Sequence, residues 1–329
     1  MLGAGLIKLR GDPCWRNFTC LYYHYETQPI PNPLSRALHF MPRWFHQLGV
    51  LFNHVSELLA PCFLFGRVRH VAGIVLVLFQ LFLILSGNLS FLNYLTIVPI
   101  LACFDDSLLR CVLPRRLVER AERAAAAAGT SRAQRVVVGA LVVVVALLSI
   151  GPVRNLLSPH QAMNTSFNRL DLVNTYGAFG SVGRERHEIV FEGTGDRVIT
   201  PSTRWEAYEF KCKPGDPERR PCIVSPYHYR LDWQIWFAAM ATPAEYPWAF
   251  HFVWKLLQND RATLALLAND PFPDGPPRHV RARLYRYEFA PPGDPSGAWW
   301  RRTLLGDWLP PVSADEPRLR NFLAARGWD

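Results

Sequence analysis

Long apolar runs fill much of the first half of the chain and are missing from the second half. Four of these runs contain few charged residues, at 48–65, 71–86, 91–104 and 136–150. Each approaches the roughly 20 residues that a helix needs to cross a bilayer. Together the second and third runs are too long for one helix, and Ser86, Gly87 and Asn88 separate them. The pattern therefore predicts four transmembrane helices, with a tight turn between the second and the third.

The second half of the chain has a different pattern. Short segments predict strands at 188–193, 205–211, 284–289 and 299–305, and 205–211 and 284–289 alternate apolar and polar residues. The segment 171–180 predicts a strand that ends in a turn. Helical periodicity predicts helices at 231–241, 248–257 and 261–267. We therefore expect a multi-pass α-helical membrane domain over 48–152, followed by a β-rich α+β globular domain over 153–329.

The arginines set the predicted orientation. The loop 105–135 contains seven of them, and basic residues next to transmembrane helices favour the cytosolic side. If this loop is cytosolic, the segments 1–47 and 153–329 both face the lumen. Within the loop, the basic segment 116–123 and the alanine run after it predict a helix. That helix either lies on the cytosolic membrane surface or is a solvated linker.

Two pairs of cysteines stand close together in polar sequence on the predicted lumenal side. They are Cys14 with Cys20 and Cys212 with Cys222. In an oxidising lumen such pairs predict disulfides, whereas in a reducing compartment they would be free thiols.

Glycosylation sequons agree with this orientation. Asn17 and Asn164 each begin an Asn-X-Ser/Thr sequon in a predicted lumenal segment. A third sequon begins at Asn88, in the tight turn, where we expect the bilayer to be too close for its use. The first residues, 1–7, are apolar but too short for a signal peptide, and we expect further spans upstream of them.

The net charge of +9 permits an anionic partner, but the arginines flank apolar runs and no nucleic-acid-binding motif is present, so we expect no nucleic-acid partner. The cysteines and histidines lack the spacing of a zinc site. We predict neither a metal nor a cofactor.

Several long segments carry a family resemblance. In the second half these are LVNTYGAFGSVGRERHEIVFEGT, WEAYEFKCKPGDPERRPC, SPYHYRLDWQIWFAA and LYRYEF. In the first half they are MLGAGLIKLRGDPCW, HYETQPIPNP and SGNLSFLNYLTIVPILACFDD. The chain closely resembles lipase maturation factors over nearly its whole length. Its Cys212/Cys222 pair and the SPYHYR segment resemble the first of the two paralogous groups in that family.

The resemblance implies a multi-pass protein of the endoplasmic reticulum membrane that is not an enzyme. It implies a role in folding, assembly and secretion of dimeric lipases such as lipoprotein lipase and hepatic lipase. Its partners would be these lipases as clients, the lipid bilayer, and lumenal chaperones or oxidoreductases. The chains of the family begin earlier, with further spans upstream, so the resemblance covers only their later part.

A factor that holds incompletely folded clients needs aromatic and arginine side chains on a lumenal surface. Our candidates lie in the GAFGS segment, in the basic loop between Cys212 and Cys222, and just after it. They are Tyr176, Phe179, Arg219, Arg220, Tyr227 and Trp233. For each of them the alternative is an ordinary core aromatic or a solvated loop residue.

An enzyme is the alternative function. The membrane half resembles, more distantly, the vitamin K-dependent γ-carboxylase, and the AGLIKL segment aligns with a stretch whose final lysine acts as a base, which is Lys8 here. Asn53, His54 and Glu57 are polar groups at membrane depth and are candidates for the same site. Alternatively, Lys8 reaches to the interface while the other three side chains form interhelical hydrogen bonds.

Two other enzyme classes do not fit. A lipase of the serine hydrolase type is excluded because no G-x-S-x-G motif is present. A thiol oxidoreductase is disfavoured because neither cysteine pair is a C-x-x-C motif.

Overall fold

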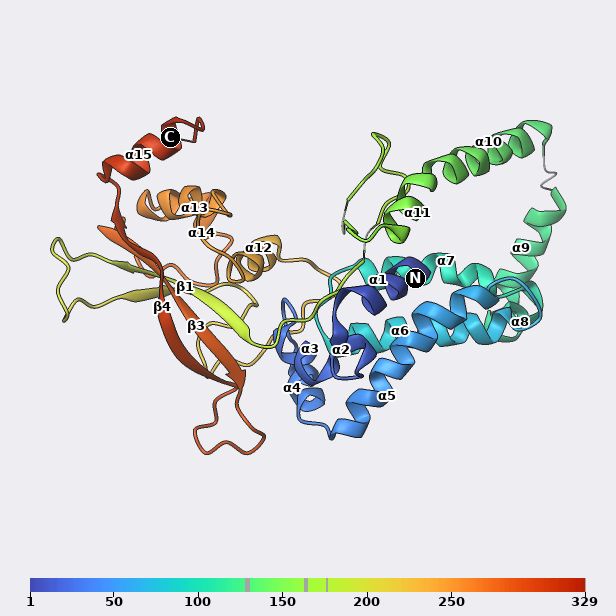
Figure 1. Ribbon diagram of the computed structural model, residues 1–329, viewed down its shortest axis with the longest axis horizontal. Coiled ribbons are helices and arrows are strands. Elements are labelled where there is room, and N and C mark those ends of the chain that lie inside the picture. Colours follow the sequence, from blue (N-terminus) through green and yellow to red (C-terminus); the bar gives the residue numbers. More distant parts are fainter. Residues whose placement is uncertain (128–130, 163–164, 176, 329) are drawn as a thin grey trace. The chain divides into compact units, whose positions relative to one another are not determined.

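The computed structural model describes residues 1–127, 131–162, 165–175 and 177–328 (Figure 1). The chain forms two compact units that do not follow the order of the sequence. The helical unit comprises 1–21, 43–82 and 93–182, and the sheet unit comprises 22–42, 83–92 and 183–329. Two segments that flank predicted membrane helices, 22–42 and 83–92, are thus parts of the sheet unit.

Helices lie at all four predicted spans. From the start of the chain to residue 157, outside the segment 22–42, the elements are α1 (Leu2–Gly11), α2 (Pro13–Arg16), α5 (Arg43–His54), the π-helix η1 (Val55–Leu59), the 3-10 helix η2 (Ala60–Phe63), α6 (Arg69–Ser86), α7 (Leu92–Ile100), the 3-10 helix η3 (Leu101–Cys103), α8 (Asp106–Val112), α9 (Arg115–Ala127), α10 (Arg132–Leu148) and α11 (Ile150–Leu157).

Among the residues described, two helical stretches are long and apolar enough to cross a bilayer. They are Arg69–Ser86, with 18 residues, and Arg132–Leu157, with 26 residues. The valines and leucines of α10 are exposed, as expected of a helix surrounded by lipid. The helix at the third predicted span, Leu92–Cys103, is shorter and contains Pro99. At the first predicted span the α-helix gives way to a π-helix at Val55.

The basic segment of the loop 105–135 forms α9, as predicted. Side chains cap the helices on either side of it. Asp105 accepts the Leu108 N–H at the start of α8, and Ser131 accepts the Gln134 N–H at the start of α10. Such caps satisfy backbone donors that a helix start otherwise leaves without a partner.

The sheet unit is built on four antiparallel strands in the order β2-β1-β3-β4. They are β1 (Arg186–Thr194), β2 (Glu206–Tyr208), β3 (His279–Phe289) and β4 (Trp300–Ser313). Four of the five predicted strands are confirmed, as is the predicted pairing of 284–289 with 299–305.

The strand predicted at 171–180 was wrong. The described part of this segment forms turns with one isolated bridge, between Ser166 and Asn174. Asp171 has a positive φ angle of 52°, which an extended strand does not allow. The positive φ of 59° at Phe179 lies where the turn was predicted. The segment belongs to the helical unit.

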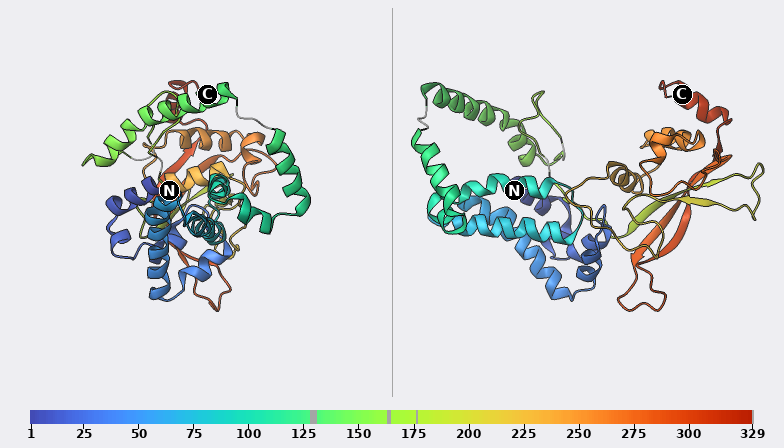
Figure 2. Two further views of the ribbon diagram at one scale, coloured as in Figure 1. Left: turned by 90° about the vertical axis from the view of Figure 1, so that its right-hand side faces the viewer. Right: turned by 180° about the vertical axis from the view of Figure 1, so that it is seen from behind.

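One face of the sheet packs against helices. The helices of this unit are α3 (Leu21–Thr27), α4 (Pro33–His39), α12 (Arg230–Ala238), α13 (Trp248–Leu257), α14 (Arg261–Leu264) and α15 (Pro317–Ala324). The helices α13, α14 and α15 lie along the same side of the strands in opposite views (Figures 1 and 2). Phe191 of β1 and Ala282 of β3 join Ile235 of α12 and Val253 of α13 in the main hydrophobic core.

The opposite face of the sheet is covered as well. Arg186, Glu188 and Val190 of β1 point to this face, together with Tyr287 and Trp300 of β3 and β4. All five are buried. Loop segments cover them, because the Arg186 guanidinium donates to carbonyls of residues 26–29 and Tyr287 donates to the Gly215 carbonyl. A strand buried on both faces is typical of the centre of a sheet covered by two layers.

Candidate functional site

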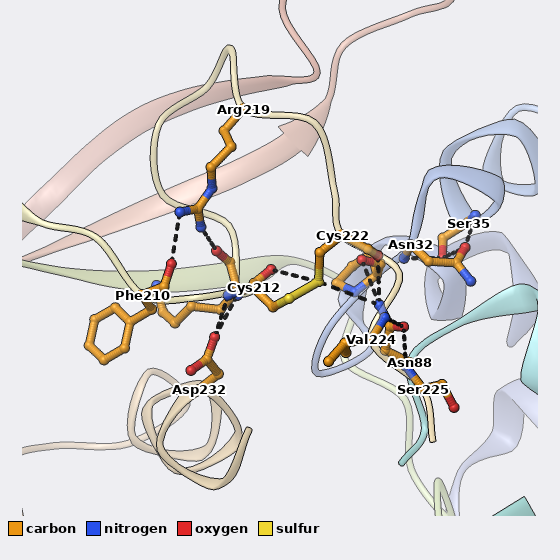
Figure 3. Close-up of a disulfide and its surroundings, with 12 residues drawn as sticks. Asn32, Ser35, Asn88, Phe210, Cys212, Arg219, Cys222, Val224, Ser225 and Asp232 are labelled. Atoms are coloured by element: carbon orange, nitrogen blue, oxygen red, sulfur yellow. Dashed lines mark hydrogen bonds between the residues drawn. A yellow bond between two sulfur atoms is a disulfide. The ribbon is translucent and has the colours of Figure 1, made fainter. Parts of the chain in front are cut away.

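The Cys212–Cys222 disulfide closes the basic loop of the sheet unit (Figure 3). The Asp232 carboxylate, at the start of α12, accepts the N–H groups of Cys212 and Lys213 at 2.7 and 2.8 Å. In the middle of the loop, the Pro217 carbonyl accepts the N–H groups of Trp299 and Trp300. The loop is therefore fixed at several points rather than free in solvent.

Arg219 holds the loop from within. Its guanidinium donates to the carbonyls of Phe210 and Lys213 at 2.7 and 2.6 Å, and it forms an ion pair with Glu209 at 3.4 Å. Its neighbour Arg220 is exposed and lies over the Trp299 ring at 5.7 Å. Of the two arginines proposed to contact clients, only Arg220 presents its charge to solvent.

Asn88, in the predicted tight turn, fastens the end of this loop. Its amide N–H donates to the Cys222 carbonyl at 2.9 Å, and its carbonyl accepts the N–H groups of Val224 and Ser225. Figure 3 shows these bonds beside the disulfide. Asn88 is 2% exposed, so its sequon is inaccessible in the folded unit for a reason beyond the nearness of the bilayer.

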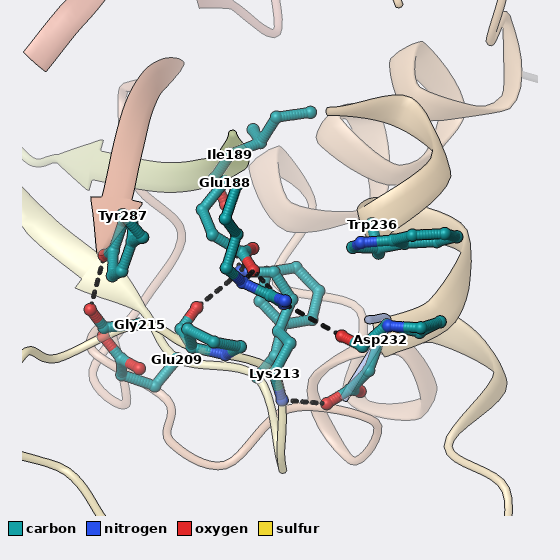
Figure 4. Close-up of polar contacts among 12 residues, drawn as sticks. Glu188, Ile189, Glu209, Lys213, Gly215, Asp232, Trp236 and Tyr287 are labelled. Carbon is teal, nitrogen blue, oxygen red and sulfur yellow. Dashed lines mark hydrogen bonds and ion pairs between the residues drawn. The ribbon is translucent and has the colours of Figure 1, made fainter. Parts of the chain in front are cut away.

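A buried ionic network lies behind the loop (Figure 4). The Lys213 ammonium pairs with the Glu188 carboxylate at 2.8 Å, and Arg186 donates to the same carboxylate at 2.8 Å. The Arg186 guanidinium also donates to the carbonyls of Glu26 and Pro29 at 2.8 and 2.9 Å. The network links the loop, strand β1 and the segment 26–29.

A cavity of about 420 Å³ opens next to the loop, around the start of α12; we call it the aromatic cavity. Its apolar walls are formed by Tyr227, Tyr229, Leu231, Trp248 and Leu266. Its polar lining is formed by Lys211, His228, Arg230, Asp232 and Gln234. Four of these residues, Tyr227 to Arg230, are consecutive in the SPYHYR segment, which contains the cis Ser225–Pro226 bond.

The electrostatics of the cavity follow from burial. Burial raises the pKa of Asp232, although hydrogen bonds from Lys213 and Cys212 and the nearby cations oppose the shift. Burial and the neighbouring Arg230 lower the pKa of His228 below its usual value, with a small opposing effect of Asp232. The imidazole is therefore neutral at neutral pH, and Lys211 and Arg230 provide the positive charge of the lining.

The structure separates the proposed client-binding residues into two groups. Arg219, Arg220, Tyr227 and Trp233 belong to the sheet unit, whereas Phe179 belongs to the helical unit, where its carbonyl accepts the Trp15 indole N–H. Tyr227 lines the aromatic cavity and is 64% exposed. Trp233 is half-buried beside His228, with ring centroids 5.1 Å apart.

The remaining candidate, Tyr176, lies outside the described residues. Asp232, Trp248 and Leu266 were not recognised from the sequence as parts of a site. Asp232 lies just after the SPYHYR segment, in the first turn of α12, and this position could have pointed to it. Trp248 and Leu266 carry no such local signal, because only the fold brings them to the cavity.

Lys8 is enclosed in the helical unit. Its ammonium donates to Asn53 and pairs with Glu57, both at 2.8 Å, and it lies 4.8 Å from the centre of the Trp15 ring. His54 contacts the Trp15 carbonyl at 3.0 Å. Lys8 is 6% exposed, so it is paired inside the unit and does not reach outward. The polar side chains form interhelical contacts, as in the structural alternative described above.

The second disulfide, Cys14–Cys20, lies in the helical unit. Asp12 caps the short helix α2 by accepting the Cys14 N–H at 2.9 Å. The glycosylation candidate Asn17 is exposed within the disulfide loop, whereas Asn164 lies outside the described residues. Among the residues that the structure describes, no group of three or more His, Cys, Asp or Glu side chains is placed to hold a metal ion.

Two family models match the chain. One, described as the lipase maturation factor transmembrane domain, matches residues 1–111. The other, described as the lipase maturation factor C-terminal domain, matches residues 172–310. Lipase maturation factor 1 of Bos taurus is 52% identical, with 100% of this chain and 62% of that protein covered. This chain belongs to the lipase maturation factor family.

Within the lipase maturation factor family, the two paralogous groups differ in similarity to the chain. Lipase maturation factor 1 of Homo sapiens is 50% identical, with 100% of this chain and 61% of that protein covered. Lipase maturation factor 2 of Rattus norvegicus is 28% identical, with 99% of this chain and 60% of that protein covered. The chain spans about three fifths of the length of these curated relatives. No solved structure matches it.

The family membership confirms a membrane protein with a transmembrane domain and a separate C-terminal domain that contains the sheet. The residues that match the family model of the C-terminal domain include the Cys212–Cys222 loop and all the residues that line the aromatic cavity.

Removing the Cys212–Cys222 disulfide should weaken the sheet unit. Replacing both cysteines with serine should lower its free energy of unfolding by about 2–3 kcal/mol, because the opened loop gains conformational freedom in the unfolded chain. Limited proteolysis in increasing urea would measure the change. The exposed free cysteine Cys111 supplies the control, since Cys111→Ser should change nothing. Free thiols at both positions in mass spectrometry of the native protein would contradict the prediction.

Proposed function

We propose that this chain acts in the endoplasmic reticulum membrane and assists the folding, assembly and secretion of dimeric lipases, with lipoprotein lipase and hepatic lipase as clients. The observation that carries the proposal is about 50% identity, over the whole chain, to proteins named lipase maturation factor 1. The exposed Tyr227, Ile223 and Arg220 of the sheet unit supply contact surface for a client.

We further propose the multi-pass topology described from the sequence, with four spans, the loop 105–135 in the cytosol, and residues 1–47 and 153–329 in the lumen. The sheet unit supports it. A compact unit lies on one side of a bilayer, so its three segments, 22–42, 83–92 and 183–329, must share a side, as this topology requires. Lumenal oxidoreductases would be partners during disulfide formation, and lumenal chaperones would be partners in client folding.

Protease protection would test this topology. In sealed microsomes, protease added from outside should cut within 105–135 and leave the fragment from 153 onward intact, with one glycan at Asn164. Asn17→Gln and Asn164→Gln should each remove one glycan, whereas Asn88→Gln should remove none. Cleavage of the sheet unit from the outside would contradict the topology.

Lipase secretion is the test of the function. In cells that lack the endogenous family member, an upstream-extended form of this chain should restore secretion of active lipase. The chain without the extension would be compared at matched abundance, to establish whether an upstream segment is needed. Failure of the extended form at normal abundance would contradict the proposal.

Substitutions of Lys8 distinguish a factor that holds folding clients from an enzyme. Lys8→Ala leaves Glu57 buried without its cation, which destabilises the fold, so abundance should fall several-fold. Lys8→Met combined with Glu57→Leu removes both charges and should restore abundance and lipase secretion together. In the carboxylase-like alternative, this double variant would be inactive at normal abundance, and so would Lys8→Arg, because a guanidinium does not readily deprotonate.

A further inference from the structure

The aromatic cavity has the size and surface of a binding site. Its volume of about 420 Å³ lies within the roughly 300–1,000 Å³ range of ligand pockets. Tyr227 and Leu266, two of its apolar wall residues, remain 64% and 51% exposed. Rigid tyrosine rings provide contact area at a low cost in conformational entropy. The cavity can therefore accept a large apolar side chain.

The charge at the cavity is positive. Lys211 and Arg230 are exposed lining residues, and neither forms an ion pair within the part of the chain that the structure describes. The carboxylate of the lining, Asp232, is 1% exposed and its Oδ1 is occupied by two N–H groups of the disulfide loop. Complementarity therefore favours a ligand that places a negative charge beside its apolar group.

The cavity lining also holds a buried acceptor. Asp232 Oδ2 has no hydrogen-bond partner among the described residues, and it turns away from the loop that Oδ1 binds (Figure 3). This oxygen is enclosed, since Asp232 is 1% exposed, so it is not available to a donor on a ligand. The apolar walls are open, because Tyr227 and Leu266 are more than half exposed. Such a cavity can cover one apolar side chain of a peptide, whereas it would leave much of the chain of a fatty acid in water.

We propose that the aromatic cavity binds an extended peptide segment of an incompletely folded client, in which a large apolar side chain is closely followed by an acidic one. The apolar side chain enters between Tyr227, Trp248 and Leu266. The acidic side chain pairs with Lys211 and Arg230. The identity of the occupant as a folding client rests on the proposed function.

Charge exchange tests the cavity directly. The full chain in detergent would be titrated into two fluorescent peptides that share one apolar sequence and differ only in a Glu or a Lys after the central Phe. The wild-type chain should bind the Glu peptide at least about tenfold more tightly. Lys211→Glu should reverse or abolish this preference. Arg197→Glu, an equal charge change at an exposed position outside the cavity, should leave it intact.

A second pair of variants tests the apolar wall of the cavity. Leu266→Glu should weaken binding of the Glu peptide at least about tenfold, whereas Val198→Glu, also at an exposed apolar residue, should not. Equal binding of both peptides, insensitivity to Lys211→Glu and Leu266→Glu, or displacement of the peptide by laurate at the same sites would each overturn the assignment. Native resistance to protease would establish that every variant is folded.

The same variants separate the cavity from the wider function. If the peptide results hold but Lys211→Glu restores lipase secretion fully, the cavity assignment stands and its use in lipase maturation is contradicted. If removal of the sheet unit abolishes secretion while Lys211→Glu and Leu266→Glu leave peptide binding unchanged, the wider function stands and the cavity assignment fails.

Discussion

Truncation before Trp205 should abolish the restoration of lipase secretion. It removes three of the four strands, the helices α12 to α15 and both cysteines of the disulfide loop. Strand β1 would lose β2 and β3, its two neighbours. Ile189 and Phe191, both 0% exposed in the folded unit, would then face solvent, so the remaining segment could not form a stable core.

The measurement is lipase activity in the medium, normalised to lipase synthesis and to the abundance of the variant, in the upstream-extended form. Activity should fall to the level of cells without the factor. Arg197→Glu, in an exposed part of the same unit, should retain full activity at matched abundance. Wild-type secretion by the truncated form would show that the sheet unit is dispensable and would remove the basis of the proposed function.

Replacing Arg186 with alanine should destabilise the sheet unit by about 3–5 kcal/mol, because breaking a buried ion pair leaves groups without partners in a medium of low polarity. Arg186 and Glu188 are 1% and 0% exposed. The substitution removes the donor to the carbonyls of Glu26 and Pro29 and takes one of two cations from Glu188. Segment 22–42 should then detach from strand β1 and become sensitive to protease.

The control is Arg204→Ala. Arg204 also forms an ion pair with a glutamate, Glu206, but its side chain is 88% exposed, so its loss should cost less than about 1 kcal/mol. Urea-dependent proteolysis of both variants, followed by mapping of the first cleavage site, would compare them. Equal stability of the two variants would show that the buried network does not hold the segment in place.

The sequence by itself predicted the local elements whose patterns are complete within a few residues. Period-2 alternation identified 284–289 as a strand, and a short apolar run ending near a glycine identified 188–193. Both lie inside observed strands. The spacing of Cys212 and Cys222 in a Pro- and Gly-containing loop predicted the disulfide that the structure contains. The strand predicted within 171–180 was wrong, because the positive φ angle at Asp171 turns the backbone where the local pattern allowed a strand.

Only the tertiary structure decided which polar residues are buried and what surrounds them. Arg186 and Glu188 are charged residues on one face of β1, so the sequence predicts that this face is exposed to solvent. In the structure, segments distant in sequence cover both side chains. Asn88 begins a sequon, but its side chain forms hydrogen bonds with residues that lie 134 to 137 positions away in the chain. Asp232 and Leu266 meet at one cavity in the same way. Local patterns constrain the backbone within a few residues, whereas burial depends on contacts between segments far apart in the chain, which no local pattern contains.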